Sequence, residues 1–277
     1  MNLFPNKRRA SLLAIALALP TVGGAQELEN TITPPERPYP YQILDLMPGV
    51  TADEAIAHYQ ERMDIEMVPE VMSISVQAPN GRTFAFDFPQ RYMTAGVGIN
   101  TRMGSQPYSE IQLDLATEVM GGRVVGITRQ MRAPTGELPD AAALQAQLEE
   151  LYGPPSQIST DAGYSMIYAW GEDGFIPDLD AQEERVIEWD AGTAMRTHHY
   201  RPCADHADKS YNFQQFRKPI KPECVAVFRV AISNSPPNRS ISFSLIDYDL
   251  MRQSHVETDA QIADYLLGEA EASDFDL

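Results

Sequence analysis

The best-specified stretch of this chain is Arg123–Pro155, which reads RVVGITRQMRAPTGELPDAAALQAQLEELYGPP. Its first part, 124–131, is rich in β-branched residues and predicts a buried strand. Its second part places apolar residues at helical spacing with glutamine and glutamate between them: Leu144, Leu148, Leu151 and Tyr152. Gly153 and two prolines then end the helix. The stretch therefore predicts a strand followed by a helix that covers a sheet, and it carries no marked chemistry.

A hairpin is predicted where two apolar alternations meet around Gly81. A two-residue turn would put the apolar sets of 72–76 and 84–88 on opposite faces. A three-residue loop with a left-handed Gly81 instead pairs Val76 with Phe84, so burial favours that loop.

The remaining elements follow from similar signals. Thr51 and Glu54 form a capping box at the start of a helix, and Thr258 is predicted to cap a last helix that runs to about Leu267. Further strands are predicted to end near Asn100 and to occupy 108–119, 164–170, 185–189, 195–200, 224–232 and 240–248. Since short turns join most strands, we predict an α+β fold with mainly antiparallel sheets, each covered by one or two helices.

The N-terminus has the three parts of a secretory signal peptide. Basic residues at 7–9 precede an apolar core at 12–19, and small residues follow at 23–25. The core is too short to cross a bilayer, which takes roughly 20 residues. Residues 1–25 are therefore predicted to be cleaved near Ala25, which leaves a periplasmic or secreted bacterial protein without a membrane span.

Changes in composition along the mature chain indicate where its segments and domains begin and end. Residues 26–40 are rich in proline and predict an extended segment. An acidic loop with proline and glycine follows residue 170, which indicates a first α+β domain or subdomain at 41–176 and a second subdomain at 177–277. A single large domain is an open alternative at this length.

The chain is strongly acidic. Its net charge is −18, and loss of the three cations in residues 1–25, which hold no acidic residue, makes it −21. Such a charge disfavours nucleic acid and anionic membrane surfaces as partners and favours cationic ones.

The chain has two cysteines, Cys203 and Cys224, which in an exported protein predict a disulfide. The loop between them holds every lysine of the mature chain, with aromatic residues interleaved. Cations with aromatic anchors are typical of contact surfaces. The alternative is an ordinary loop whose aromatic residues fold back onto the core. The candidate partner-binding residues are Lys209, Tyr211, Phe213, Phe216, Arg217, Lys218 and Lys221.

The densest set of potential metal ligands is His198, His199 and His206, close to Cys203. Zinc takes three or four such ligands in tetrahedral geometry, whereas adjacent histidines on a strand point to opposite faces. We therefore predict no metal and no cofactor. No serine-hydrolase elbow, zinc-protease helix or phosphate-binding loop is present in the sequence, and no catalytic residue is assigned.

Two short patterns resemble those of small bacterial envelope proteins. Pro48–Ala55, PGVTADEA, resembles a G-[MV]-T-x-x-E helix start, and Leu151–Pro155, LYGPP, resembles an L-x-G-x-P helix end. Such helices pack on antiparallel sheets in the BamE/SmpA lipoprotein family and in β-lactamase-inhibitor-protein-like folds. The whole chain resembles exported proteobacterial proteins. The resemblance implies a helix-on-sheet fold and a partner-binding role. This chain lacks the lipid-bearing cysteine, and no functional residue is carried over.

These features together predict an exported protein that acts through binding or structural interaction, with another envelope protein as the expected partner. A non-enzyme fits the sequence better than an enzyme. The alternative is an exported hydrolase or metal-dependent enzyme that uses His198, His199 and His206. The oligomeric state is left open.

Overall fold

The computed structural model describes residues 27–271 of the 277-residue chain, apart from 79, 161–162, 191–193 and 205–222. The predicted signal peptide and most of the loop between the cysteines lie outside these residues.

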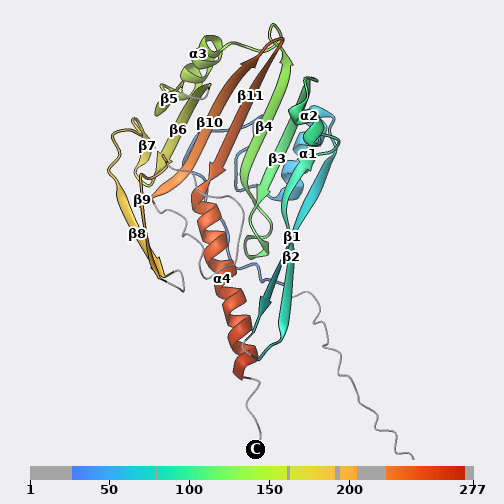
Figure 1. Ribbon diagram of the computed structural model, residues 1–277, viewed down its shortest axis with the longest axis vertical. Coiled ribbons are helices and arrows are strands. Elements are labelled where there is room, and N and C mark those ends of the chain that lie inside the picture. Colours follow the sequence, from blue (N-terminus) through green and yellow to red (C-terminus); the bar gives the residue numbers. More distant parts are fainter. Residues whose placement is uncertain (1–26, 79, 161–162, 191–193, 205–222, 272–277) are drawn as a thin grey trace, which may run out of the picture.

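A nine-stranded sheet forms the centre of the fold (Figure 1). Its order is β1-β2-β3-β4-β11-β10-β6-β5, with β7 also paired to β6, and every pairing is antiparallel. The predicted α+β class with a mainly antiparallel sheet is therefore confirmed. The strands are β1 Met67–Gln77, β2 Thr83–Thr94, β3 Tyr108–Leu115, β4 Val124–Pro134, β5 Gln157–Ser159, β6 Tyr164–Gly171, β7 Gly174–Ile176, β10 Cys224–Ser235 and β11 Asn238–Asp247.

The last two strands, β10 and β11, lie between β4 and β6. Strands from 41–176 and from 177–277 therefore share one sheet. Two further strands, β8 Arg185–Asp190 and β9 Met195–Tyr200, form a separate antiparallel pair.

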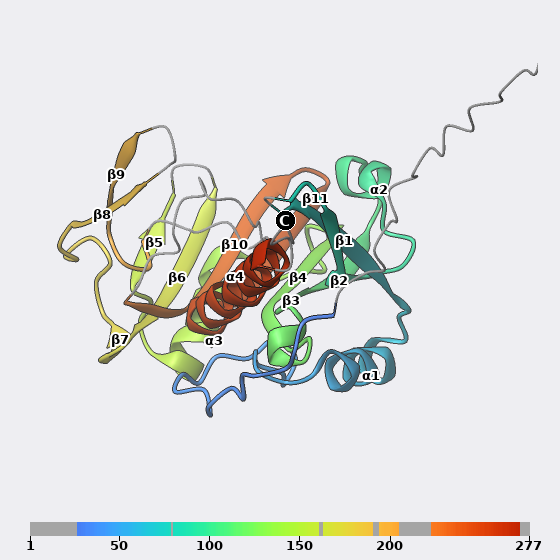
Figure 2. The ribbon, with the colours of Figure 1, turned by 90° about the horizontal axis from the view of Figure 1, so that it is seen from below.

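Both faces of the large sheet bury apolar side chains. On one face, residues 39–43 pack with α1 (Ala52–Met63) and α3 (Ala141–Tyr152), and the Tyr41 ring lies 5.7 Å from that of Phe228. On the other face, α4 (Tyr248–Glu271) packs on β10 and β4. Figure 2 shows α1 and the N-terminal segment on one side of the sheet and α2 (Ile99–Met103) on the other.

The C-terminal half of α4 packs against the β1–β2 hairpin, in the lower part of Figure 1. Ile262 is fully buried among the three phenylalanines of β2. The hairpin has the predicted register, since Val76 pairs with Phe84 and Gly81 has a φ of +84°. The apolar alternation therefore did select the three-residue loop.

Helix starts and ends were predicted with mixed success. The capping box of Thr51 and Glu54 is confirmed, and Asp140 caps α3 by accepting from Ala143 N at 2.8 Å. Leu148 of α3 is buried, but Leu151 is 70% exposed, so its assignment to the apolar stripe was wrong. The α3 stripe is narrower than predicted.

Two elements differ from prediction. The strand expected to end near Asn100 stops at Thr94, because Gly96 and Gly98 interrupt it, and Asn100 lies in α2. The last helix starts ten residues before Thr258, whose hydroxyl donates to Ser254 O inside α4 instead of capping it. Asp247 caps this helix, since its Oδ1 accepts from Leu250 N at 2.7 Å.

Asp247 also anchors the N-terminal segment to the sheet. Its side chain is fully buried, and its Oδ2 accepts a hydrogen bond from Tyr39 Oη at 2.8 Å and pairs with Arg37 Nε at 3.1 Å. Burial raises the pKa of Asp247 to about 6, although Arg37 and the hydrogen bonds act in the opposite direction. Arg37 pairs in addition with Asp249, at 3.3 Å. This group of charges holds residues 37–39 against the start of α4.

The predicted disulfide is confirmed. Cys203 and Cys224 are bonded, with their Cα atoms 5.1 Å apart, and both are buried in the core beneath α4. Such a bond is typical of proteins that fold in an oxidising compartment. Among the described residues, no helix combines the length and apolarity needed to cross a membrane.

Candidate functional site

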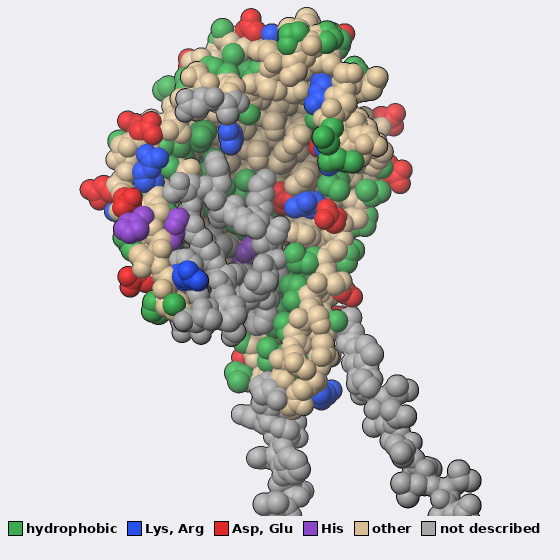
Figure 3. Space-filling model, in the orientation of Figure 1, with side chains coloured by type: hydrophobic (Ala, Val, Ile, Leu, Met, Phe, Trp, Pro, Cys, Tyr) green, Lys and Arg blue, Asp and Glu red, His purple; other side chains and the backbone are tan. Residues whose placement is uncertain are grey.

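The part of the sheet that extends beyond α4 presents a polar surface, which we call the polar face. Side chains on a strand alternate between faces, so Ile241, Phe243 and Leu245 of β11 point to the α1 side and its serines to the α4 side. The polar face comprises Thr128, Gln130, Arg132, Ser165, Arg229, Ser233, Ser240, Ser242 and Ser244. Figure 3 shows a shallow hollow in this region, lined largely by uncharged polar groups.

The strand register places these side chains in rows across β4, β11, β10 and β6. Gln130 pairs with Ser242, which is opposite Ala231, which in turn is opposite Ser165. Neighbouring side chains in such a row have Cβ atoms about 4.5–5.5 Å apart. The hydroxyl and amide groups therefore converge on one small area.

A pocket of about 160 Å³ lies in this area and is named here the serine pocket. Its polar lining comes from Gln130, Ser165, Arg229, Ser233, Ser240 and Ser242, with Ser159, Tyr108 and Tyr164 also in its wall. Pockets that bind drug-sized ligands have volumes of about 300–1,000 Å³. The serine pocket is therefore the right size for one small molecule or one unit of a longer chain.

Of the described residues that line the pocket, only Arg229 has a charged side chain. It is exposed, and it forms no hydrogen bond or ion pair with any residue that the structure describes. On β10 it stands opposite Ser244 and Ile167, so its cross-strand neighbours are a hydroxyl and an apolar side chain. A guanidinium without a partner among the described residues can pair with an anion.

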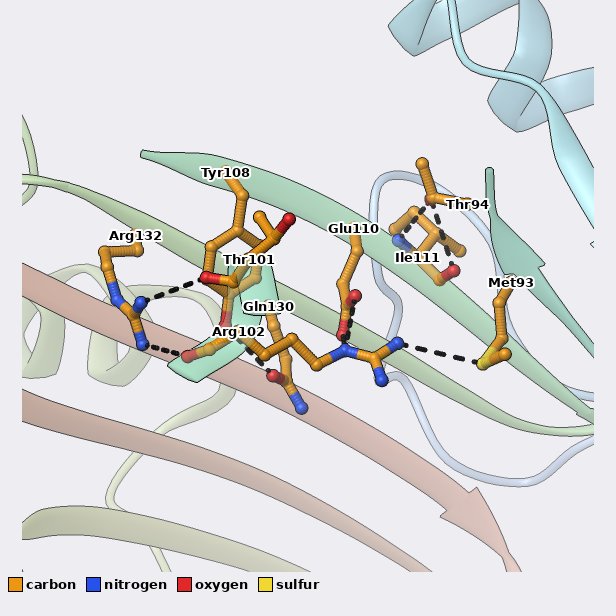
Figure 4. A network of polar contacts seen from close by, with 9 residues as sticks. All are labelled: Met93, Thr94, Thr101, Arg102, Tyr108, Glu110, Ile111, Gln130 and Arg132. Atoms are coloured by element: carbon orange, nitrogen blue, oxygen red, sulfur yellow. Dashed lines mark hydrogen bonds and ion pairs between the residues drawn. The ribbon is translucent and has the colours of Figure 1, made fainter. Parts of the chain in front are cut away.

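The rim beside the pocket is held by a second arginine (Figure 4). Arg132 donates from Nη2 to Arg102 O at 2.8 Å and from Nη1 to Gly104 O, which satisfies carbonyls at the end of α2. Its Nε donates to Ser240 Oγ at 3.2 Å, and its guanidinium lies 5.1 Å from the Tyr108 ring centre. The guanidinium of Arg132 is therefore used in hydrogen bonds within the protein.

An ion pair fixes the same rim to β3. Arg102 Nε lies 2.9 and 3.1 Å from the two carboxylate oxygens of Glu110, which is 5% exposed. Asn238 adds a hydrogen bond from Nδ2 to Ser105 O at 2.7 Å. These contacts fix the shape of the rim and leave Arg229 as the free cation of the described pocket lining.

The serine pocket offers groups for recognition. A guanidinium can hold a carboxylate or phosphate through two parallel hydrogen bonds. Serine hydroxyls both donate and accept, and an amide side chain does both at separate atoms. This combination suits a ligand that carries one anionic group beside several hydroxyl groups.

The partner-binding residues proposed from the sequence cannot be compared with the serine pocket. Lys209, Tyr211, Phe213, Phe216, Arg217, Lys218 and Lys221 all lie outside the described residues, as does His206. The partner-binding loop therefore stays a prediction.

His198 and His199 are adjacent on β9 and have different surroundings. His199 Nδ1 lies 2.8 Å from Glu184 Oε1, whereas the His198 ring stacks on Tyr200 with centroids 6.2 Å apart. Within the part of the chain that the structure describes, no group of three or more His, Cys, Asp or Glu side chains could hold a metal ion.

A second hollow of about 470 Å³ lies between β7 and the start of β8. Glu172, Asp173, Glu183 and Glu223 line it together with Arg185. Arg185 already pairs with Glu183 at 3.0 Å and with Glu223 at 3.2 Å. Its cation is therefore neutralised, in contrast to Arg229.

The chain was compared with protein families, curated proteins and solved structures. No family model, curated protein or solved structure matches the chain. The functional interpretation therefore rests on the residues of the polar face.

Sequence reasoning missed the serine pocket. One signal was present, because Ser240, Ser242 and Ser244 alternate with Ile241, Phe243 and Leu245, which indicates a strand with one hydroxyl face. The position of Arg229 opposite Ser244 depends on the pairing of β10 with β11, which the alternation alone does not give.

Proposed function

We propose that this chain is an exported, non-catalytic binding protein of the bacterial envelope, and that the serine pocket holds a small anionic ligand rich in hydroxyl groups. An acidic sugar, free or as one unit of a polymer, has this chemistry. The observation that carries the proposal is the exposed Arg229 guanidinium, which has no partner among the described residues and lies on a surface of serine hydroxyls.

Export is supported by the N-terminal signal pattern and by the Cys203–Cys224 bond. Binding at a preformed surface is supported by the rim contacts of Arg132 and Arg102, which hold α2 in place without using Arg229. A rigid surround lowers the ordering cost that a ligand must overcome. The hydrolase alternative involves His206, which lies outside the described residues, so no described observation favours it.

Titration calorimetry with glucuronate and glucose as probes tests the proposal. Glucuronate is expected to bind more tightly than glucose, because only its carboxylate can pair with Arg229. The Arg229→Gln substitution should weaken glucuronate binding about 10- to 100-fold, since a hydrogen bond to a charged group contributes about 1.5–3 kcal/mol.

The matched control is Arg196→Gln, which removes an exposed arginine from β9, outside the pocket. This variant should bind glucuronate as the wild type does. Equal affinity of the Arg229→Gln variant and the wild type would refute the role of Arg229, and absence of glucuronate binding would refute the ligand class.

A further inference from the structure

The outer edge of β1 carries a second surface, distinct from the serine pocket. β1 ends the strand order of the large sheet and pairs with β2 alone among the described strands. The opposite edge strand, β5, has only three residues, whereas β1 has eleven. Short edge strands resist pairing with another chain, and long ones present a row of free backbone groups that invites it.

The hairpin geometry shows which backbone groups face outward. Ala78 N donates to Arg82 O at 2.8 Å, which makes Ala78 and Arg82 a hydrogen-bonded pair. Since such pairs alternate along an antiparallel ladder, the even-numbered residues from Met72 to Val76 direct their backbone groups to β2. The N–H and C=O groups of Ser73 and Ser75 then point away from the sheet.

The outward edge is uncharged. Residues 71–77 read VMSISVQ and contain no charged residue and no proline, in a chain with a net charge of −18. A register shift between Glu70 and Val71 and the turn at Gly81 bound this segment. Natural edge strands are commonly protected by charges, prolines or bulges, and here such protection lies outside 71–77.

The segment is also symmetric about Ile74. Met72 and Val76 are the apolar residues two positions away on either side, and Ser73 and Ser75 are its direct neighbours. Ser73 and Ser75 are exposed on one face, while Met72, Ile74 and Val76 are half-buried against the α4 side.

We propose that two copies of this chain pair through β1, antiparallel and centred on Ile74, so that the two large sheets become one. In this register Ser73 lies opposite Ser75 of the second copy, Met72 lies opposite Val76, and Ile74 lies opposite Ile74. Each hydrogen-bonded pair exchanges two backbone bonds. The apolar row of each hairpin continues into that of the other copy.

The symmetry argues for a second copy of this chain over an unrelated partner. A two-fold interface needs one patch that is complementary to itself. An uncharged strand with serines and then apolar residues on either side of Ile74 meets that condition. The acidic remainder of each copy repels the other, so added salt should strengthen the dimer by screening this repulsion.

Sedimentation velocity on the purified protein tests the pairing. The wild type should dimerise with rising concentration, and the S73K/S75K and S73E/S75E variants should each be monomeric, because like charges would face each other across the two-fold axis. An equimolar mixture of the two variants should regain a dimer. A wild type that stays monomeric, variants that stay dimeric, or a mixture that stays monomeric would each overturn the proposal.

Cross-linking provides an independent test that adds no charge. Residues opposite each other in a non-hydrogen-bonded pair have Cα atoms about 4.5 Å apart, within disulfide range. The Ile74→Cys variant should therefore form a covalent dimer on mild oxidation, because the two native cysteines are already bonded to each other. The control Ile158→Cys, on the β5 edge, should stay monomeric, and equal cross-linking of both variants would contradict pairing at β1.

Discussion

Substitution of Arg37 by methionine is expected to destabilise the fold by about 3–5 kcal/mol at pH 8, since removal of one member of a buried ion pair leaves the other charge uncompensated. The Arg37 side chain is 5% exposed, and Asp247 beside it is fully buried. Urea unfolding of the wild type and the variant would measure the loss. We expect the N-terminal segment around Tyr39 to detach first, because Arg37 is part of its anchor.

The effect should depend on pH in a defined direction. Burial raises the pKa of Asp247 from 3.8 to about 6 in the folded protein, so the folded state binds more protons than the unfolded state between these values. The unfolding free energy contributed by Asp247 therefore falls as the pH rises from about 4 to about 6 and is constant above that. Without Arg37 the pKa of Asp247 should rise further, so the variant should continue to lose stability above pH 6. The difference between wild type and variant should therefore be larger at pH 8 than at pH 5.

Arg62→Met is the matched control. Arg62 pairs with Asp45 at 2.7 Å, but both side chains are largely exposed, and such pairs contribute at most about 1 kcal/mol. The same loss of stability for Arg37→Met at pH 5 and at pH 8 would show that Arg37 contributes through packing alone and that its charge is unimportant.

Loss of the disulfide should lower the free energy of unfolding by an amount comparable to that expected for Arg37→Met. The Cys203→Ala/Cys224→Ala double variant is expected to lose about 3 kcal/mol of unfolding free energy, because the bond closes a loop of 21 residues in the unfolded chain. Alanine suits both positions, since each cysteine is buried among apolar residues. Equilibrium unfolding in urea measures the change.

Reduced wild-type protein is the control for the cysteine double variant. If the covalent bond is the source of the stability, reductant should lower the stability of the wild type toward that of the double variant and leave the double variant unchanged. A double variant as stable as the oxidised wild type would show that the bond adds nothing to the fold.

Local signals predicted the local structure well. The capping box at Thr51 needs only residues three apart, and the pairing of Val76 with Phe84 follows from two adjacent alternations and one turn. In both cases the interacting groups are close in sequence, so the pattern contains the information needed.

The errors arose where a distant contact decided the outcome. Thr258 is a residue type that favours helix starts, but it is buried inside α4, where its hydroxyl lies 2.5 Å from that of Thr117. Asp247 is also a residue type that favours helix starts, and it does cap α4. It is the last residue of an alternating strand, however, and that alternation hid the start of the helix.

The serine pocket illustrates the same limit on a larger scale. Most of its lining comes from β4, β6, β10 and β11, and the insertion of the last two strands between the others brings Gln130, Ser165 and Arg229 together. The sequence indicates that each strand has one polar face. It does not contain the strand order, so the convergence of those faces could not be predicted.

The most direct test of the proposed function is a titration of ¹⁵N-labelled protein with glucuronate, followed by backbone amide NMR. We predict the largest shift changes at Ser165, at 229–233 and at 240–242, and their loss in the Arg229→Gln variant. Shift changes that centre on Gly171–Pro177 at the second hollow, or no shift changes, would contradict the assignment of the serine pocket as the ligand site.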